Sequence, residues 1–143
     1  MFKQVPYKSE HLKFLLEQKM NAHLRSSLLP LLEAFEKSEA VTGLSDGVPM
    51  VCGGVLPYWK GRGQVWCVFN EESKASFVPV LRGIKKFLDG VDFNRIEICV
   101  PCDEEITETA ARRAQLLGFE IECLRAKKYL PTGEDCVLMS RTK

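Results

Sequence analysis

The sequence predicts an α/β fold in which a mixed sheet of about seven strands packs with four helices. The first observation is the order of the apolar patterns: strand, two helices, three strands, helix, strand, helix and two strands. The second is Asp46-Gly47, a hairpin turn signal that makes the strands on either side of it antiparallel neighbours. The third is a helix between the strands at 64–69 and 95–100, which makes this pair parallel.

The N-terminal part is predicted as a short strand and two helices. Residues 2–5 form the strand, and Ser9 is suited to cap the first helix. Apolar residues of this helix follow helical spacing at Leu12, Leu15, Leu16 and Met20. The same spacing at Leu28, Leu31, Leu32 and Phe35 predicts a second helix. It has Pro30 in its first turn, where proline is tolerated, and ends near Lys37.

Three strands follow, at 39–45, 48–56 and 64–69. The last two are predicted to be joined by a longer hairpin loop, PYWKGRG. Gly53-Gly54 lies inside a strand and predicts a bulge or a close approach of another backbone segment.

The C-terminal part alternates helices and strands. An amphipathic helix over 77–90 closes on Gly90, and residues 95–100 form a strand. The next helix ends on Gly118, which is expected to take the left-handed conformation that ends many helices. Strands at 119–125 and 135–141 complete the sheet.

The composition predicts one soluble domain over residues 1–143. Hydrophobic residues make up 45% and charged residues 27% of the chain, with a net charge of +1. This balance does not favour nucleic acid or a membrane surface as a partner. No apolar run reaches the length of a membrane span, and the first residues lack the plan of a secretory signal. A cytoplasmic location is therefore expected.

Six cysteines are expected to be free thiols, because most lie within apolar runs. Cys99 and Cys102 form a Cys-x-x-Cys motif between a strand and a helix. No second cysteine pair follows, so no metal site is predicted. A redox motif and two ordinary cysteines both remain as interpretations, although only about 40 residues follow the motif, too few for the rest of a thioredoxin fold.

The element order, together with ARRAQLLGFEIE and YLPTGEDCVLMSR, resembles the GNAT superfamily of N-acyltransferases over nearly the whole chain. The segments GGVLPYWKGRGQVWCVF and SFVPVLRGIKKFLD more closely resemble phage-encoded GNAT-like proteins, some of which are internal virion proteins. The resemblance implies a GNAT-type sheet with one parallel, splayed strand pair at its centre.

The resemblance also implies acetyl-coenzyme A as a cosubstrate, bound between the two parallel strands, and an amine acceptor of unknown identity. The pantetheine arm would bond to the backbone of Cys67, Val68 and Phe69. The pyrophosphate would lie on the following loop and helix start, at Ser73, Lys74, Ala75 and Ser76, where backbone N–H groups attract anions. Transfer to an amine needs a base, and the departing thiolate needs an acid.

The chain departs from the GNAT pattern at two places. The pyrophosphate loop, NEESKAS, has no glycine, and Glu71 and Glu72 would repel a phosphate. The tyrosine that serves many members as the acid would fall four residues before Gly118, where this chain has Ala114.

Glu97 and Tyr129 are the predicted catalytic residues, as base and acid. A paired carboxylate and a structural tyrosine are the alternatives, and Tyr58 is a further candidate of the same kind. Trp59 and Trp66 are read either as an acceptor pocket or as core. Four basic side chains are read either as phosphate contacts or as a solvated helix face: Lys74, Arg82, Lys85 and Lys86.

Two main functions follow from these observations. One is an acetyl-coenzyme A-dependent N-acyltransferase with a degenerate pyrophosphate loop. The other is a catalytically silent phage protein that keeps the fold and either is packaged in the virion or binds a host factor. A small redox protein is the third hypothesis.

Overall fold

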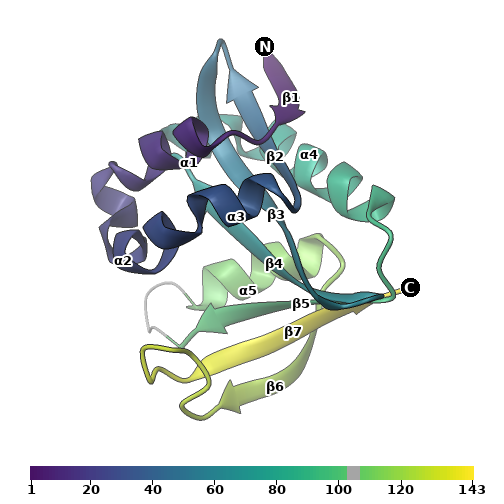
Figure 1. The fold of residues 1–143 in the computed structure, drawn as a ribbon. Helices are drawn as coiled ribbons and strands as arrows, with labels where there is room; N and C mark the ends of the chain where they lie inside the picture. The colour runs from purple at the N-terminus through teal and green to yellow at the C-terminus, as the bar shows by residue number, and fades with distance from the viewer. Residues whose placement is uncertain (103–106) are drawn as a thin grey trace. The chain divides into compact units, whose positions relative to one another are not determined.

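The computed structural model describes residues 1–102 and 107–143, and of residues 74–77 and 107 it describes the backbone alone. Seven strands form one mixed sheet in the order β1-β2-β3-β4-β5-β7-β6 (Figure 1). Their bounds are β1 Phe2–Pro6, β2 Glu39–Ser45, β3 Val48–Trp59, β4 Arg62–Phe69, β5 Arg95–Pro101, β6 Glu120–Ala126 and β7 Cys136–Thr142. The β4–β5 pair is parallel. The predicted fold class is thereby confirmed.

The chain divides into two compact units. The first comprises residues 1–56 and 65–91, and the second comprises residues 57–64 and 92–143. The prediction of one domain over 1–143 stays a prediction. The parallel register pairs Arg62–Gln64 with Arg95–Glu97 and lies wholly within the second unit.

Four helical regions occur in the described residues: α1 (Ser9–Leu16), an interrupted stretch with α2 (Arg25–Leu28) and α3 (Leu32–Glu36), α4 (Phe77–Gly90) and α5 (Thr107–Leu116). The first predicted helix, which included Met20, ends at Leu16, and Met20 lies in a 3₁₀ turn at Lys19–Leu24. The second predicted helix is broken by another 3₁₀ turn at Leu29–Leu31. Pro30 lies in the second of these turns, because it has no N–H to continue a helix. Ser9 begins α1 rather than capping it, and its hydroxyl bonds to Glu36 Oε1 at 2.8 Å.

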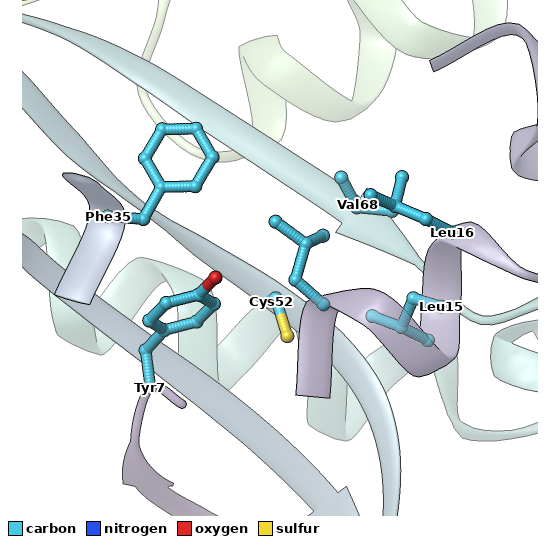
Figure 2. Packing of buried hydrophobic residues seen from close by; sticks show 7 residues of the cluster. Tyr7, Leu15, Leu16, Phe35, Cys52 and Val68 are labelled. Atoms are coloured by element: carbon cyan, nitrogen blue, oxygen red, sulfur yellow. The ribbon is translucent and has the colours of Figure 1, made fainter. Parts of the chain in front are cut away.

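One core of the first unit lies where α1 and α3 pack on β3 and β4. Side chains from these elements and from the end of β1 converge there (Figure 2): Tyr7, Leu12, Leu15, Leu16, Phe35, Cys52 and Val68. Trp66 stacks on Phe35 with ring centroids 3.9 Å apart, and the Tyr7 ring meets Trp66 edge-on. Trp66 therefore packs against the hydrophobic core, which is one of the two interpretations that the sequence allowed for it.

The opposite face of the same strands is covered by α4 (Figure 1). Val80 and Ile84 of α4 pack against Val51 and Phe69. An apolar cavity of about 40 Å³ remains between α4 and the strands, with Cys67 in its lining. Alternation along β4 thus sends Trp66 and Val68 to one face and Cys67 and Phe69 to the other.

The two hairpins of β2, β3 and β4 differ from one another in how well the sequence predicted them. Asp46 and Gly47 both have positive φ, as the predicted tight turn requires. The longer loop predicted over 57–63 is wrong, since β3 runs to Trp59 and β4 begins at Arg62. Gly61, with φ of 90°, makes this short turn, and its carbonyl accepts the N–H groups of Asn94 and Arg95.

In the second unit, α5 packs on β5 and β7 (Figure 1). The helix ends as predicted, because Gly118 has a φ of 95°. The N–H of Phe119 bonds to the Ala114 carbonyl and that of Gly118 to the Gln115 carbonyl, each at 3.0 Å. These two bonds form a Schellman motif, which satisfies the last helix carbonyls and starts β6.

The two glycines of β3 serve close backbone approach, the second of the two predicted reasons. A Cβ on Gly54 would lie 2.3 Å from the Glu39 carbonyl oxygen, and one on Gly53 would lie 2.8 Å from that of Trp66. The bulge itself occurs earlier in β3, where the register with β2 shifts between Gly43 and Leu44.

We expect Gly54→Ala to lower the free energy of unfolding by about 2 kcal/mol or more, because the new Cβ meets a backbone that cannot move aside. Gly90→Ala is the matched control, since a Cβ there meets no described atom within 4 Å. Urea unfolding of both variants measures the difference. Equal stabilities would contradict the role given to Gly54.

Candidate functional site

The segment after β4 is the part of the first unit on which the coenzyme expectation depends. Residues 71–76 form a 3₁₀ turn that leads into α4. Asn70 is 2% exposed, and its Nδ2 donates to the Pro49 carbonyl at 2.9 Å. Its Oδ1 accepts the Glu72 N–H at 2.8 Å, and its carbonyl accepts the Ser73 N–H at 3.0 Å. The buried Asn70 therefore fixes the start of the turn through these hydrogen bonds.

A second buried asparagine, Asn21, ties the end of β4 to the end of α1. Its Nδ2 donates to the Phe69 carbonyl at 2.8 Å and to the Leu15 carbonyl at 2.9 Å. Because an unpaired buried carbonyl is unfavourable, this pair of hydrogen bonds fixes the course of the chain at Phe69.

Glu71 links the same turn to the segment between α1 and α2. Its backbone N–H donates to Gln18 Oε1 at 3.0 Å, and its carboxylate accepts the Met20 N–H at 2.7 Å. The N–H groups of Glu71, Glu72 and Ser73 thus all have acceptors within the protein. A phosphate placed on these three N–H groups would have to displace oxygens of Gln18 and Asn70.

The structure separates the predicted coenzyme contacts into four groups. Val68 is buried in the core with α1, whereas Cys67 and Phe69 face α4. Ser73 is 7% exposed, and its N–H belongs to the Asn70 turn. The side chains of Lys74, Ala75 and Ser76 lie outside the described residues. The backbone contacts predicted for these residues remain predictions.

The second unit carries a network of ion pairs on β4, β5, β6 and β7. Glu97 is 1% exposed, and its Oε2 accepts the Nε–H groups of Arg62 and Arg95. Arg95 also donates to Glu122 at 2.8 Å, and the Ser140 hydroxyl donates to Glu122 at 2.7 Å. Register brings these groups together, because Gln64 and Ser140 are the neighbours of Glu97 on β4 and β7.

Glu97 is a paired carboxylate, one of the two readings that its sequence position allowed. The hydrogen bond from Arg62 lowers the pKa of Glu97, the bond from Arg95 acts in the same direction, and burial acts against them. A carboxylate held in this way is a weak proton acceptor near neutral pH. The predicted role of Glu97 as a base stays a prediction.

Tyr129 lies in the connection between β6 and β7 and is 46% exposed. Partial burial, followed by the nearby Cys99 and Glu97, raises its pKa, so the phenol stays protonated at neutral pH. Among residues 1–102 and 107–143, its hydroxyl has no hydrogen-bond partner. A protonated, unpaired phenol is able to donate a proton, which is the predicted role.

Burial also raises the pKa of Tyr58, but its hydroxyl, unlike that of Tyr129, has a hydrogen-bond partner. Its hydroxyl donates to Gln64 Oε1 at 2.6 Å, and the Arg62 guanidinium lies over its ring at 4.8 Å. Trp59 is 61% exposed, and the same guanidinium lies 4.5 Å from its ring centroid. Tyr58 and Trp59 thus hold Arg62 between them, and Trp59 does not belong to a core.

The Cys-x-x-Cys motif contains free thiols, as do the other four cysteines. Burial, with Cys136 nearby, raises the pKa of Cys99 to about 12. Reactive cysteines of redox motifs have lowered pKa values, so this environment does not favour the redox interpretation.

Ala114, at the position of the usual acid, is 3% exposed and has no group that transfers a proton.

In the part of the chain that the structure describes, no three His, Cys, Asp or Glu side chains gather as a metal site. None of the described helices has the length and apolar character needed to cross a membrane.

The arrangement of strands and helices is that of known acetyltransferases. The ribosomal-protein-S5-alanine acetyltransferase from Vibrio fischeri matches with a TM-score of 0.72 and 17% identity, covering 99% of this chain and 92% of that one. Ard1 from Thermoplasma volcanium matches with a TM-score of 0.74 and 11% sequence identity, and the match covers 99% of this chain and 97% of Ard1. An acetyltransferase of the GNAT family from Streptococcus pneumoniae matches with a TM-score of 0.65 and 14% sequence identity, and the match covers 99% of each chain. The chain has the GNAT fold.

The likeness concerns structure rather than sequence. No protein-family model matches the chain, and no curated protein sequence matches it. The predicted GNAT resemblance is confirmed at the level of the fold, and its phage-specific part stays a prediction.

Sequence reasoning missed Gln18, Asn21 and Asn70, the residues that occupy the turn after β4. Asn70 carried a usable signal, since an asparagine directly after a strand commonly bonds to the N–H two residues later. Gln18 and Asn21 carried none, because they lie 53 and 48 positions from their partners.

We expect the network around Arg95 to make stability depend on pH. Arg95 and Ser140 lower the pKa of Glu122 from 4.5 to about 2. A carboxylate whose pKa is lowered in the folded state stabilises the protein when the pH is above the pKa of the unfolded state. This stabilisation is lost as the pH falls from about 4.5 to about 2. Glu122→Gln should flatten the fall in stability over that range. Unfolding measured at several pH values tests this.

Glu120→Gln is the matched control, because Glu120 lies on the same strand and has no ion-pair partner among the described residues. This variant should keep the wild-type pH dependence. If Glu122→Gln lost stability on acidification as steeply as the wild type, the role of Glu122 would be wrong.

Proposed function

We propose that the chain is an acetyl-coenzyme A-dependent N-acyltransferase that holds the coenzyme pyrophosphate weakly. The observation that carries this proposal is the match of 99% of the chain to the folds of several acetyltransferases. The acceptor is an amine, whose nitrogen attacks the thioester carbonyl; the C–S bond breaks and the thiolate of coenzyme A takes up a proton.

In this proposal, Tyr129 supplies that proton. Its raised pKa keeps the phenol protonated, and its hydroxyl has no partner among the described residues to restrain it. Glu97 holds Arg62 and Arg95 in place, and its low basicity leaves water as the acceptor of the proton from the amine. The backbone of residues 67–69 and the turn at 71–76 are the proposed coenzyme contacts.

The turn at 71–76 supports weak binding of the pyrophosphate. Three of its N–H groups already have acceptors, and Glu71 and Glu72 add negative charge to it. Coulomb repulsion of a phosphate by each exposed carboxylate is on the order of 1 kcal/mol or less once solvent and salt screen it. Coenzyme affinity should therefore be low and should rise with salt.

The second candidate is a silent relative that keeps the fold without binding the coenzyme. The occupied N–H groups of the turn favour this candidate, and so does Ala114 in the position of the usual acid. Packaging in a virion and binding of a host factor are further parts of this candidate, and they rest on the sequence resemblance alone.

Calorimetric titration with acetyl-coenzyme A separates the two candidates. We expect the double variant Glu71→Gln, Glu72→Gly to bind several-fold more tightly than the wild type, because it removes both charges and frees the backbone. Glu17→Gln with Glu33→Gln removes the same charge elsewhere and should leave the affinity unchanged. Absence of binding by the wild type and by the double variant would refute the transferase proposal and favour the silent relative.

For catalysis, we expect Tyr129→Phe to lower kcat by roughly 100-fold, with little change in KM for acetyl-coenzyme A, because the variant lacks only the donated proton. Tyr58→Phe is the control, since the Tyr58 hydroxyl is bonded to Gln64. Release of the coenzyme thiol with a panel of amines measures both variants. Equal rates for wild type and Tyr129→Phe would remove Tyr129 from the mechanism.

A further inference from the structure

The first unit has a groove of about 510 Å³ between the edge strand β1 and the helix α4. Its apolar part is formed by Phe2 of β1 and Phe87 and Val91 at the end of α4. Its charged part is formed by Arg82 and Lys86, with Glu39 as the one acidic residue of the lining. None of these residues belongs to the coenzyme contacts of the proposed function, which are residues 67–69 and 71–76, although the sequence also allowed Arg82 and Lys86 as phosphate contacts.

The backbone of β1 offers hydrogen bonds along this groove. Tyr7 donates to the Ala40 carbonyl, and Met1 accepts from Asp46, so the odd-numbered residues of this segment bond to β2. In an antiparallel pair the intervening residues direct their N–H and C=O groups to the other side. Phe2 and Gln4 therefore present these groups at the free edge of the sheet, and their side chains line the groove. Pro6 has no N–H and ends this edge.

The two cations of the groove have no acidic partner among the described residues. Arg82 and Lys86 lie one helical turn apart on the same side of α4, and both are exposed. Lys85, on the same helix, is paired with Asp89 at 3.2 Å. Of the three basic residues of α4 singled out by the sequence, two thus face the groove and one does not.

We propose that this groove binds an extended, acidic peptide segment of a partner protein, which adds to β1 as a further strand. Backbone groups of the peptide bond to Phe2 and Gln4, and alternate side chains point to α4. An apolar side chain meets Phe2 and Phe87, and an acidic side chain meets Arg82 and Lys86. A second copy of this chain fits poorly, because Lys3 is the only charged residue of β1 and would meet the same cations.

The proposal is independent of acetyl transfer, so its test uses the protein without coenzyme. The probe is a fluorescent, end-blocked peptide in which pairs of glutamates alternate with pairs of valines, so that each face of the extended strand carries both residue types. Binding is followed by fluorescence anisotropy. We expect saturable binding that the double variant Arg82→Gln, Lys86→Gln weakens by about tenfold. Lys85→Gln, with the same charge change on the same helix, should bind as the wild type does.

Two further comparisons address strand addition itself. A probe methylated on every backbone nitrogen, and the variant Gln4→Pro, each remove hydrogen bonds at the edge without changing charge. Both should bind weakly, and a thermal melt checks that the variant is folded, as expected when proline replaces a residue whose N–H points outward.

Three results would overturn the proposal. They are no binding of the glutamate–valine probe, equal binding of a lysine–valine probe, and equal binding of the methylated probe. Self-association of the wild type that Gln4→Pro abolishes would also overturn it, because the occupant would then be a second copy of the chain.

Discussion

Two buried asparagines at the end of β4 determine the conformation on which the functional question depends. Asn21 and Asn70 are 3% and 2% exposed, and each must place its amide hydrogens on acceptors inside the protein. Leaving such a group unpaired costs about 1 to 3 kcal/mol, so the segments that supply the acceptors are held in place. These segments are the end of α1, the start of β3 and the end of β4.

The consequence reaches the turn at 71–76. Asn70 accepts the N–H groups of Glu72 and Ser73, and Gln18 accepts that of Glu71, so these three N–H groups have acceptors without a ligand. The GNAT fold and open N–H groups at residues 71–73 are therefore separate properties. The chain has the fold, whereas an anion bound at these three groups requires the protein to exchange its own hydrogen bonds for those of a phosphate.

In the second unit, a buried charged group likewise has its partners inside the protein. Glu97 is buried, and two arginines on its own strand and on β4 make that burial possible. The arginines are in turn held by Tyr58, Trp59 and Glu122. This network joins β4, β5 and β6, and Tyr129 is a titratable side chain near it whose hydroxyl has no partner among the described residues.

The sequence by itself determined the strands, the helices after β3, the hairpin at Asp46-Gly47 and the helix end at Gly118. These features depend on periodicity and on backbone conformations that a few residue types adopt, so they are local. The tertiary structure decided the breaks between α1 and α3, the pairing of Glu97, and the occupation of the turn after β4. Each of these depends on partners far apart in the chain, such as Glu71 with Met20 and Gln18, at separations of 51 and 53 residues. No local pattern carries that information, because such a contact exists only once the strands and helices have packed.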